Sequence, residues 1–515
     1  MLERHFTKKL IEWKNSTVAK ALLIDGARQV GKTSTIEDFA KNNYENVIKI
    51  DFVETPEAVQ LIGEAKNLND LLLRITSIAG RPISGSVSEA ISDSSADRTD
   101  NSNRNVAFDL TDDPISDSPA CTISDSSLAN TTNSIKALLF FDEIQKCGDV
   151  VTWMRYLADD DRFDVIFSGS MLGVEAYNYR SLPVGTIDIY EMFPMDFEEF
   201  SWACGVDASI WDVVRECFAN TKPVPDFIHE KLIELFYRYV LVGGMPEAVQ
   251  VFVSTSDTQA TRARQASILD NYRADITRYV DDKMNAQRIK TIFNSIPSQL
   301  NKENKRFIVA DIDKRRRFMS MQSDFDWLVS AGVAISVKRV TQASFPLGID
   351  QDISYFKLYM NDVGLLFSTF SNVSVQDIVA MRNTINFGSA FENAVAQELR
   401  ATGDASIFYY NRRGTGEVDF LINRPGCPEV MPIEVKSGGN SHAHAALNHL
   451  LDVKNYGVRG AVVLHVKNVE AGGEVSSSRS GKSATSGRDN AHLASSAKSN
   501  VVYLPIYMAF LLRSC

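Results

Sequence analysis

A glycine-rich stretch at residues 26–33 constrains the fold of this chain more than any other feature. It runs Gly-Ala-Arg-Gln-Val-Gly-Lys-Thr, directly after the apolar run Ala21–Ile24 and before the helix-like segment Ile36–Ala40. The order strand, glycine-rich loop, helix is typical of a phosphate-binding loop. We therefore predict an α/β domain in which a buried parallel strand ends at a bound phosphate.

The residue types in this stretch suit phosphate binding. Gly26 and Gly31 permit backbone angles that a Cβ would penalise, so successive N–H groups can turn inward around a phosphate. Lys32 is expected to reach the β- and γ-phosphates of ATP, and the Thr33 hydroxyl to complete a Mg²⁺ shell. The flanking strand and helix favour this interpretation over a chance match. The predicted nucleotide-binding residues are Gly26, Ala27, Arg28, Gln29, Val30, Gly31, Lys32, Thr33 and Ser170.

A second apolar run, Ala137–Phe141, ends in two acids, Asp142 and Glu143. This pattern is typical of a buried parallel strand with carboxylates at its C-terminal end. Beside a phosphate loop, Asp142 would hold the Mg²⁺ shell, while Glu143 would orient or deprotonate the attacking water, with Lys32 as the second catalytic residue. The alternative is a strand that ends at solvent in an acidic turn, which the phosphate loop makes a poorer explanation.

The next predicted strand, Asp164–Phe167, is followed by Ser168 and Ser170. Either serine could contact the γ-phosphate, or could cap the following helix. Strands and helices alternate between residues 21 and 190, which predicts a largely parallel sheet with its ligand at the strand C-termini. We assign residues 1–200 to this domain.

Composition sets limits on the rest of the chain. A length of 515 residues predicts about three domains. No run of 18 apolar residues occurs, and the six cysteines form no C-x-x-C pair, so we expect a cytoplasmic protein that does not span a membrane. The net charge of −11 says little about partners, because residues 84–134 hold nine acids and two bases. This segment also has 13 serines and is predicted to be a disordered insertion or an acidic regulatory arm.

Two helical regions are expected after the first domain. Residues 201–285 predict a helical lid that closes over the nucleotide. Residues 286–345 combine a basic cluster with the helix Phe325–Ser330 and a strand pair within Gly332–Val340, which suggests a winged-helix-like module. DNA is a candidate partner of this module, and the favoured alternative is a solvated basic turn that packs on the acidic remainder of the chain. The cluster consists of Lys302, Lys305, Arg306, Lys314, Arg315, Arg316 and Arg317, and the last four are the candidate DNA contacts.

Residues 346–515 contain a second set of chemical groups. Glu392 lies on a predicted helix, Asp419 on a predicted strand, and Glu434 and Lys436 two positions apart on another. Side chains at such spacing share one face of a strand, so the set could hold a divalent cation and orient water, as in a metal-dependent phosphodiesterase. A purely structural role is the alternative. Nine serines at residues 470–499 predict another disordered insertion.

The whole layout resembles bacterial and archaeal AAA-type ATPases of AAA domain class fourteen that carry a C-terminal domain of unknown function 4143. By this resemblance, Gly26–Thr33 bind nucleotide, Asp142 and Glu143 form the acidic pair, and the last domain has a restriction-endonuclease-like α/β fold. The resembling stretches are LLIDGARQVGKT, LLFFDEIQKC, FSGSMLGV, FPMDFEEF, YVLVGGMPEAV, FKLYMNDVGLL, FGSAFENAVAQEL, GEVDFLI and PIEVKSG.

These observations predict a Mg²⁺-dependent, slow ATPase in which hydrolysis moves the lid and repositions the C-terminal domain. Three outputs remain open: a switch for protein partners with an inert C-terminal domain, an ATP-gated nuclease, or a DNA-binding module. Arg155, Arg162 and Arg180 are equal candidates for an arginine finger. The oligomeric state is open as well, and a homo-oligomer is one alternative.

Overall fold

The described residues form two β-sheets, and the first of them lies in the N-terminal part of the chain. The computed structural model describes residues 2–16, 21–83, 136–170, 185, 187–370, 387–403, 406–424, 426–438, 444–471 and 500–513. The N-terminal sheet is parallel throughout, with strand order β2-β3-β4-β1-β5. Its strands are β1 (Ala21–Asp25), β2 (Val47–Asp51), β3 (Ala137–Asp142), β4 (Phe163–Ser168) and β5 (Ile187–Glu191).

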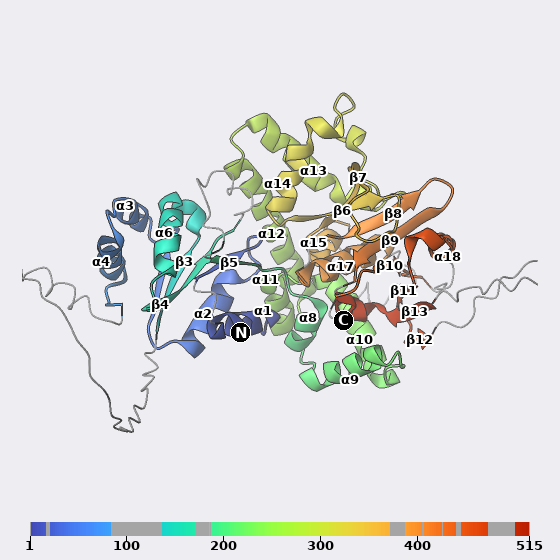
Figure 1. Cartoon of the computed structure of the whole chain (residues 1–515), viewed down its shortest axis with the longest axis horizontal. Coiled ribbons are helices and arrows are strands. Elements are labelled where there is room, and N and C mark those ends of the chain that lie inside the picture. The colour runs from blue at the N-terminus through green and yellow to red at the C-terminus, as the bar shows by residue number, and fades with distance from the viewer. Residues whose placement is uncertain are drawn as a thin grey trace, which may run out of the picture.

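Helices cover both faces of this sheet (Figure 1). α1 (His5–Asn15) and α2 (Lys32–Asn43) pack on one face, where they meet Leu138 and Phe140 of β3. The opposite face, with Leu139 and Phe141, is covered by α3 (Glu57–Gly63), α4 (Leu68–Ala79) and α6 (Gly148–Ala158), the last preceded by the short helix η1 (Ile144–Lys146). Alternating apolar side chains on a doubly covered parallel sheet give the predicted P-loop NTPase α/β fold, which is confirmed.

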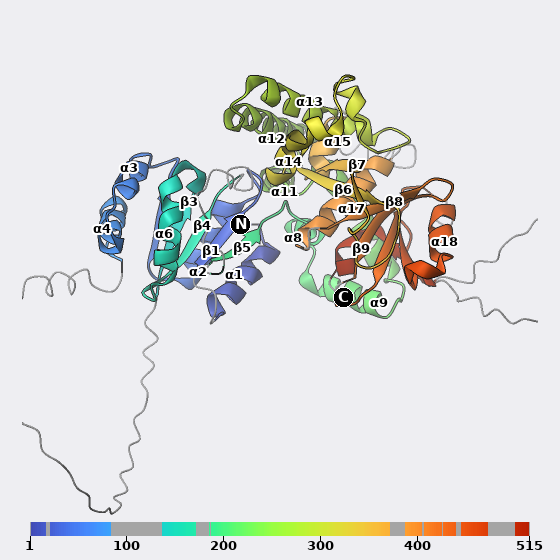
Figure 2. The ribbon, with the colours of Figure 1, turned by 45° about the horizontal axis from the view of Figure 1, so that its top comes forward.

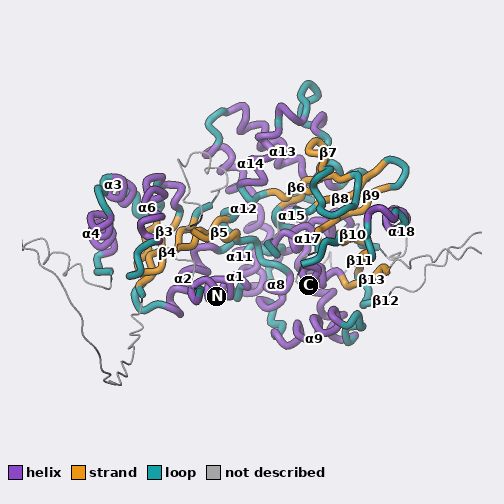
Figure 3. Tube along the Cα trace, viewed as in Figure 1, coloured by secondary structure: helices purple, strands orange, loops and turns teal. Residues whose placement is uncertain are grey.

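A group of helices lies between the two sheets (Figures 1 and 3). The turn between two of them passes so close to Met195 that a Cβ on Gly244 would lie 1.9 Å from the Met195 carbonyl oxygen, so this position requires glycine. The helices are α8 (Phe197–Ala203), α9 (Ala208–Ala219), α10 (Asp226–Val242), α11 (Pro246–Thr255) and α12 (Thr258–Tyr279).

The region predicted as a winged-helix-like module continues into the second sheet. It contains α13 (Lys283–Leu300), η2 (Val309–Asp311), η3 (Phe318–Ser320), α14 (Gln322–Ser330), β6 (Ala334–Val340) and β7 (Gln351–Met360). The expected strand pair within 332–340 is wrong: these residues form one strand, β6, which pairs with β7 across a ten-residue connection. The prediction failed because the connection is far longer than the tight turn that was expected. The hairpin therefore crosses the predicted domain boundary at residue 345.

The C-terminal sheet is mixed, with strand order β12-β13-β11-β10-β9-β8-β6-β7. β9 is antiparallel to β8 and β10, whereas β11 is parallel to β10 and β13. The strands that follow β7 are β8 (Phe408–Arg412), β9 (Gly416–Asn423), β10 (Val430–Val435), β11 (Gly460–His465), β12 (Glu470–Ala471) and β13 (Asn500–Pro505). Figure 2 shows this sheet apart from the first one, beyond the helices.

The helices of the C-terminal part are α15 (Val363–Ser368), α17 (Gly388–Ala401), α18 (Ala445–Leu451), η4 (Lys454–Tyr456) and η5 (Ile506–Arg513). The predicted insertion 84–134 and residues 472–499 of the second insertion lie outside the described residues. Residues 470 and 471, expected to belong to that insertion, form β12 because they pair with β13, so this boundary was wrong. Among the described residues, no helix is long and apolar enough to cross a membrane.

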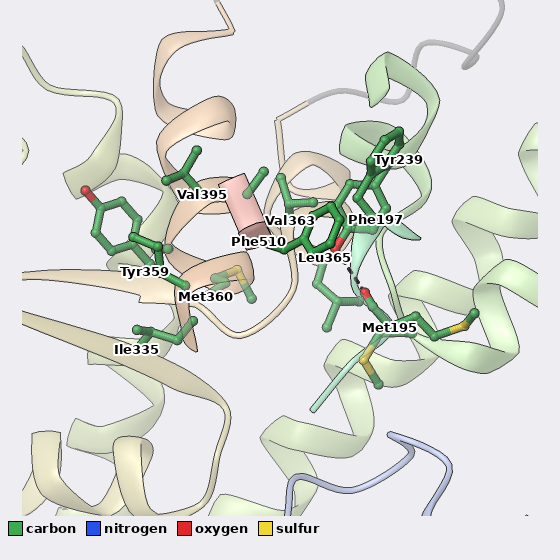
Figure 4. Packing of buried hydrophobic residues seen from close by; sticks show 14 of the residues in the cluster. Met195, Phe197, Tyr239, Ile335, Tyr359, Met360, Val363, Leu365, Val395 and Phe510 are labelled. Carbon is green, nitrogen blue, oxygen red and sulfur yellow. Dashed lines mark hydrogen bonds between the residues drawn. The ribbon is translucent and has the colours of Figure 1, made fainter. Parts of the chain in front are cut away.

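One apolar core joins the helices between the sheets to the C-terminal sheet. Phe197 of α8, Tyr239 of α10, Val363 of α15, Val395 of α17 and Phe510 of η5 all belong to it. Figure 4 shows these side chains packed together, with the Tyr239 hydroxyl donating to the carbonyl oxygen of Met195 at 2.9 Å. The predicted lid is therefore packed into the C-terminal part through shared apolar contacts.

Candidate functional sites

The glycine-rich loop lies between β1 and α2, as the sequence predicted. Gly31 has φ 96° immediately before α2, and Gly26 has φ 146°. A Cβ on Gly26 would lie 2.3 Å from the Met192 carbonyl oxygen. Both positions therefore require glycine, because a side chain would strain the backbone or clash.

Arg4 fixes one side of this loop. Its guanidinium donates to the carbonyl oxygen of Val30 at 2.8 Å, to Glu199 at 2.9 Å and to the carbonyl oxygen of Phe193 at 2.7 Å. The side chain is buried. A single cation thus connects the loop to the segment before α1 and to α8, a role that sequence spacing does not indicate because these partners are distant in the chain.

Lys32 lies at the centre of the loop. Its Nζ donates to the carbonyl oxygens of Gly26 at 2.8 Å and Ala27 at 2.9 Å and to the Ser170 hydroxyl at 3.3 Å. Burial lowers the pKa of Lys32, and the nearby Glu143 opposes this shift. Neutral oxygens are weaker partners for an ammonium group than phosphate is, so a phosphate group can replace them.

Asp142 and Thr33 form a pair of oxygen ligands. The Thr33 hydroxyl donates to Asp142 Oδ2 at 2.7 Å, and the Ser168 hydroxyl donates to the other carboxylate oxygen. Burial raises the pKa of Asp142, against the effect of these two hydrogen bonds. A hydroxyl and a carboxylate suit Mg²⁺, which usually binds one or two protein oxygens together with phosphate and water.

Glu143 lies next to this pair, in a left-handed backbone conformation with φ 54°. Gln145 donates to one of its carboxylate oxygens, and the Ser170 hydroxyl lies 3.3 Å from the other. Ser170 therefore bridges Lys32 and Glu143, whereas Ser168 is engaged by Asp142. The sequence left both serines open, and the geometry favours Ser170 for contact with a phosphate.

Two adjoining cavities surround the loop. One, of about 560 Å³, is lined by the loop, Glu143 and Ser170 and also by Asp275 and Arg278 of α12. The other, of about 430 Å³, shares Gly31 with the first and is lined further by residues such as Leu2 and Val251. Volumes of this size are typical of small-molecule sites.

Arg278 was not predicted from the sequence, because its place at the cavity depends on how α12 crosses the loop. The arginines that were predicted lie elsewhere: Arg162 pairs with Asp160 at 2.6 Å, Arg155 lies on α6, and Arg180 is outside the described residues.

α12 also holds the loop from the side of the helices. The Tyr272 hydroxyl donates to the carbonyl oxygen of Arg28 at 3.2 Å, and the Arg28 guanidinium pairs with Asp275 at 3.1 Å. The amide of Asn361, which follows β7, donates to the same Tyr272 hydroxyl at 3.2 Å. A chain of hydrogen bonds therefore runs from the loop through α12 to the end of a strand in the C-terminal sheet.

The four predicted residues of the C-terminal part gather in one cluster. Lys436 Nζ donates to Glu434 at 2.8 Å, and the backbone N–H of Val435 donates to Asp419 at 2.8 Å. Burial raises the pKa of Asp419 well above its ordinary value, and the charges of Glu392 and Glu434 add to this shift. These side chains therefore lie close together, as expected.

The cluster also contains two lysines that the sequence did not reveal. Lys357 of β7 is fully buried, and its Nζ lies 2.7 Å from Glu417, 3.7 Å from Glu392 and 3.8 Å from Asp419. Lys305 pairs with Glu392 as well. The alternation of β7 gave a weak signal, since Lys357 lies on the strand face opposite Phe356 and Leu358.

In the described residues, no group of three or more His, Cys, Asp or Glu side chains has the geometry to hold a metal ion. The pair Thr33 and Asp142 would depend on phosphate and water for its other ligands. In the C-terminal cluster, the ammonium group of Lys357 lies among the carboxylates, where a metal ion would have to bind.

The basic segment 314–317 is exposed and lies between η2 and η3. Arg316 pairs with Asp313 at 3.5 Å. The helix expected to enter a DNA groove, α14, carries Asp324 and Asp326 and no basic residue, and Asp324 pairs with Arg288. Contacts with phosphate would therefore fall to the loop rather than to this helix.

Family models match three separate parts of the chain. A model described as an AAA domain matches residues 87–201, and one described as domain of unknown function 4143 matches residues 387–477. Both were predicted, and the AAA match contains Asp142, Glu143 and Ser170 but begins after the phosphate loop. A third model, domain of unknown function 8612, matches residues 233–376, a unit that the sequence analysis did not foresee.

Solved structures that match the chain include a Walker-type ATPase of Pyrococcus abyssi, at 13% identity and TM-score 0.39, covering 72% of this chain and 95% of that one. Cdc6p of Pyrobaculum aerophilum matches at 9% identity and TM-score 0.24, covering 74% and 95%. The Orc1 protein of Aeropyrum pernix, solved in complex with DNA, matches at 10% identity and TM-score 0.25, covering 73% and 90%. No curated protein matches the chain.

Proposed function

We propose that this protein is a Mg²⁺-dependent ATPase that hydrolyses ATP at the phosphate loop of its AAA domain. One observation carries the proposal. Lys32, Ser170 and Glu143 are linked by contacts of 3.3 Å, next to the Thr33–Asp142 hydrogen bond, and Lys32, Thr33, Glu143 and Ser170 line a single cavity. This set supplies a cation for phosphate, two oxygen ligands for a metal ion and a carboxylate for water.

Each residue has a role in the proposed reaction. Lys32 donates to the β- and γ-phosphate oxygens, and Thr33 and Asp142 would hold Mg²⁺, which would supply positive charge beside the phosphates. Glu143 orients the attacking water and accepts its proton, while the Ser170 hydroxyl contacts the γ-phosphate. Arg278 supplies a further positive charge from α12 as negative charge develops.

The proposed output is a movement of α12 that follows the state of the nucleotide. The hydrogen bond of Tyr272 and the ion pair of Asp275 join α12 directly to Arg28, so a rearranged loop changes contacts of this helix. Because the helices share a core with the C-terminal sheet, the movement would reposition that sheet. Protein partners, or DNA bound through residues 314–317, are the candidate recipients.

A second candidate function is ATP-gated cleavage of nucleic acid by the DUF4143 domain. The proximity of four side chains favours it. Glu392 lies on α17, Asp419 on β9 and Glu434 on the antiparallel strand β10, and Lys436 directly follows β10. Such a restriction-endonuclease-like arrangement would need the carboxylates to bind a divalent metal ion.

Replacement of Glu143 by glutamine tests the ATPase proposal. Glu143→Gln should lower the hydrolysis rate about a hundredfold or more, because the amide cannot accept a proton. ATP affinity should stay within a factor of about three, because Lys32 and the loop are unchanged. Phosphate release and fluorescent-nucleotide binding measure the two quantities.

The matched control is Glu37→Gln, which also changes a carboxylate that lines the cavity but pairs with Lys49. This variant should hydrolyse ATP at nearly the normal rate. Full activity of Glu143→Gln would refute the assigned role of Glu143.

A further inference from the structure

Lys357 occupies an unusual position for a lysine. It lies in the middle of β7, its side chain is 0% exposed, and its ammonium group is surrounded by Glu392, Glu417 and Asp419 at 2.7–3.8 Å. These carboxylates come from different elements, α17 and β9, whose side chains converge on one point. A buried lysine retains its charge only where such partners surround it.

The charges of the cluster nearly balance. Four acids face three ammonium groups, and each lysine has an assigned partner: Lys357 lies among three carboxylates, Lys305 pairs with Glu392, and Lys436 pairs with Glu434. The Tyr359 hydroxyl, on the same face of β7 as Lys357, donates to Glu392 at 3.2 Å. The chain therefore satisfies most of the charge of these carboxylates with its own groups.

An ammonium group and a divalent metal ion compete for the same carboxylates. Both need negatively charged oxygens at short range, and two cations so close together in a buried site repel one another strongly. Metal coordination by Glu392 or Asp419 would require the ammonium group of Lys357 to move away. Since Lys357 projects from the central part of a paired strand, it cannot leave without a displacement of β7 or a different rotamer.

We propose that Lys357 is the resident cation of the C-terminal carboxylate cluster and that its ammonium group excludes divalent metal ions from it. This role is independent of ATP hydrolysis. It adds a condition to the second candidate function, because cleavage of nucleic acid at this cluster would first require Lys357 to be displaced.

Binding of Mn²⁺ to the full-length, nucleotide-free protein tests the proposal. Asp419→Asn should leave the Mn²⁺ binding of the otherwise unchanged protein as it was, because the cluster holds no metal while Lys357 is present. Lys357→Met should add one Mn²⁺ site, at least tenfold tighter than any binding at the cluster in the unchanged protein. The double variant Lys357→Met/Asp419→Asn should lose that site again. Calorimetry and the electron paramagnetic resonance signal of free Mn²⁺ both measure these outcomes.

The matched control is Lys338→Met, on the neighbouring strand β6, where Lys338 pairs in register with Phe356. It should bind Mn²⁺ as the unchanged protein does. Thermal unfolding supplies a second measurement. Lys357→Met should have a lower Tm, because Glu417 and Asp419 lose the nearby ammonium group and Glu392 keeps only Lys305. Mn²⁺ should raise that Tm but not the Tm of the double variant.

Two results would overturn the proposal. One is the loss of a Mn²⁺ site when Asp419→Asn is introduced alone, which would mean that the cluster holds metal beside Lys357. The other is a folded Lys357→Met variant that gains no Mn²⁺ site. If Lys357→Met does not fold, the comparison of Asp419→Asn with the unchanged protein still decides. Neither result depends on whether the phosphate loop hydrolyses ATP.

Discussion

The two sites of this protein use buried lysines in opposite ways. Lys32 is 6% exposed and Lys357 is 0% exposed, so burial does not distinguish them. Their partners do: Lys32 donates to two backbone carbonyls and a serine, and Lys357 lies among three carboxylates. A lysine held by neutral oxygens stays ready for an anionic ligand, whereas one held by carboxylates acts as a counter-ion.

The surroundings of the two lysines agree with this difference. Lys32 lines a cavity of about 560 Å³ together with main-chain and side-chain donors of the loop. Lys357 shares its site with Tyr359 and with a second ammonium group, that of Lys305, which pairs with Glu392. The first arrangement is suited to a ligand that brings negative charge, and the second already contains the opposite charges that it needs.

The largest expected effect separates the lysines of the two sites. Lys32→Ala removes the ammonium group that would bind phosphate. Because one or two charge-assisted hydrogen bonds are then lost, ATP affinity should fall about a hundredfold. Lys436→Ala removes the same kind of group from the C-terminal cluster and should leave ATP affinity unchanged. Titration with a fluorescent ATP analogue measures both variants. Equal losses, or none in Lys32→Ala, would contradict the contrast between the sites.

A smaller effect is expected at the edge of the nucleotide cavity. Arg278→Ala should lower kcat about tenfold to a hundredfold, with a lesser change in KM, because its charge matters most as negative charge develops on the phosphate. Arg162→Ala is the control, since Arg162 pairs with Asp160 in an exposed turn. Steady-state hydrolysis measures both. If only Arg162→Ala impairs hydrolysis, the positive charge comes from a neighbouring chain rather than from α12.

The sequence predicted the parts of the nucleotide site that lie in short segments. The loop 26–33 and the acids after β3 follow apolar strands directly, and the end of a parallel strand is where a ligand is expected. The same reasoning placed Ser170 near the cavity, and a resemblance in motifs predicted the matches to the AAA and DUF4143 family models. In these segments, local pattern and tertiary position coincide.

Other functional residues were missed because their positions depend on distant packing. Arg4 reaches the loop from before α1, Arg278 from α12, and Lys357 enters the carboxylate cluster from β7, near the start of the same predicted domain. Arg4 and Arg278 lie in no motif, and the stretch FKLYMNDVGLL, which contains Lys357, did not indicate a role for this lysine. The error over the β6–β7 hairpin had the same origin, because the long connection concealed the pairing of the two strands.

The smallest expected effect concerns the link between the two regions. Tyr272→Phe keeps the ring in the core but removes the hydroxyl that donates to Arg28 and accepts from Asn361, both at 3.2 Å. Two long hydrogen bonds contribute about 1 kcal/mol together, so ATP affinity should fall only about fivefold.

A double-mutant cycle distinguishes a link from mere proximity. Asn361→Ala alone should weaken ATP binding, although the Asn361 side chain lies beyond the nucleotide cavity. Added to Tyr272→Phe, the same substitution should have little further effect on ATP affinity. The coupling energy obtained from the four affinities then measures how strongly the phosphate loop senses the end of β7. Additive effects would mean that the loop and the C-terminal sheet share a core without sharing a signal, and the proposed output would have to pass through the Arg28–Asp275 ion pair instead.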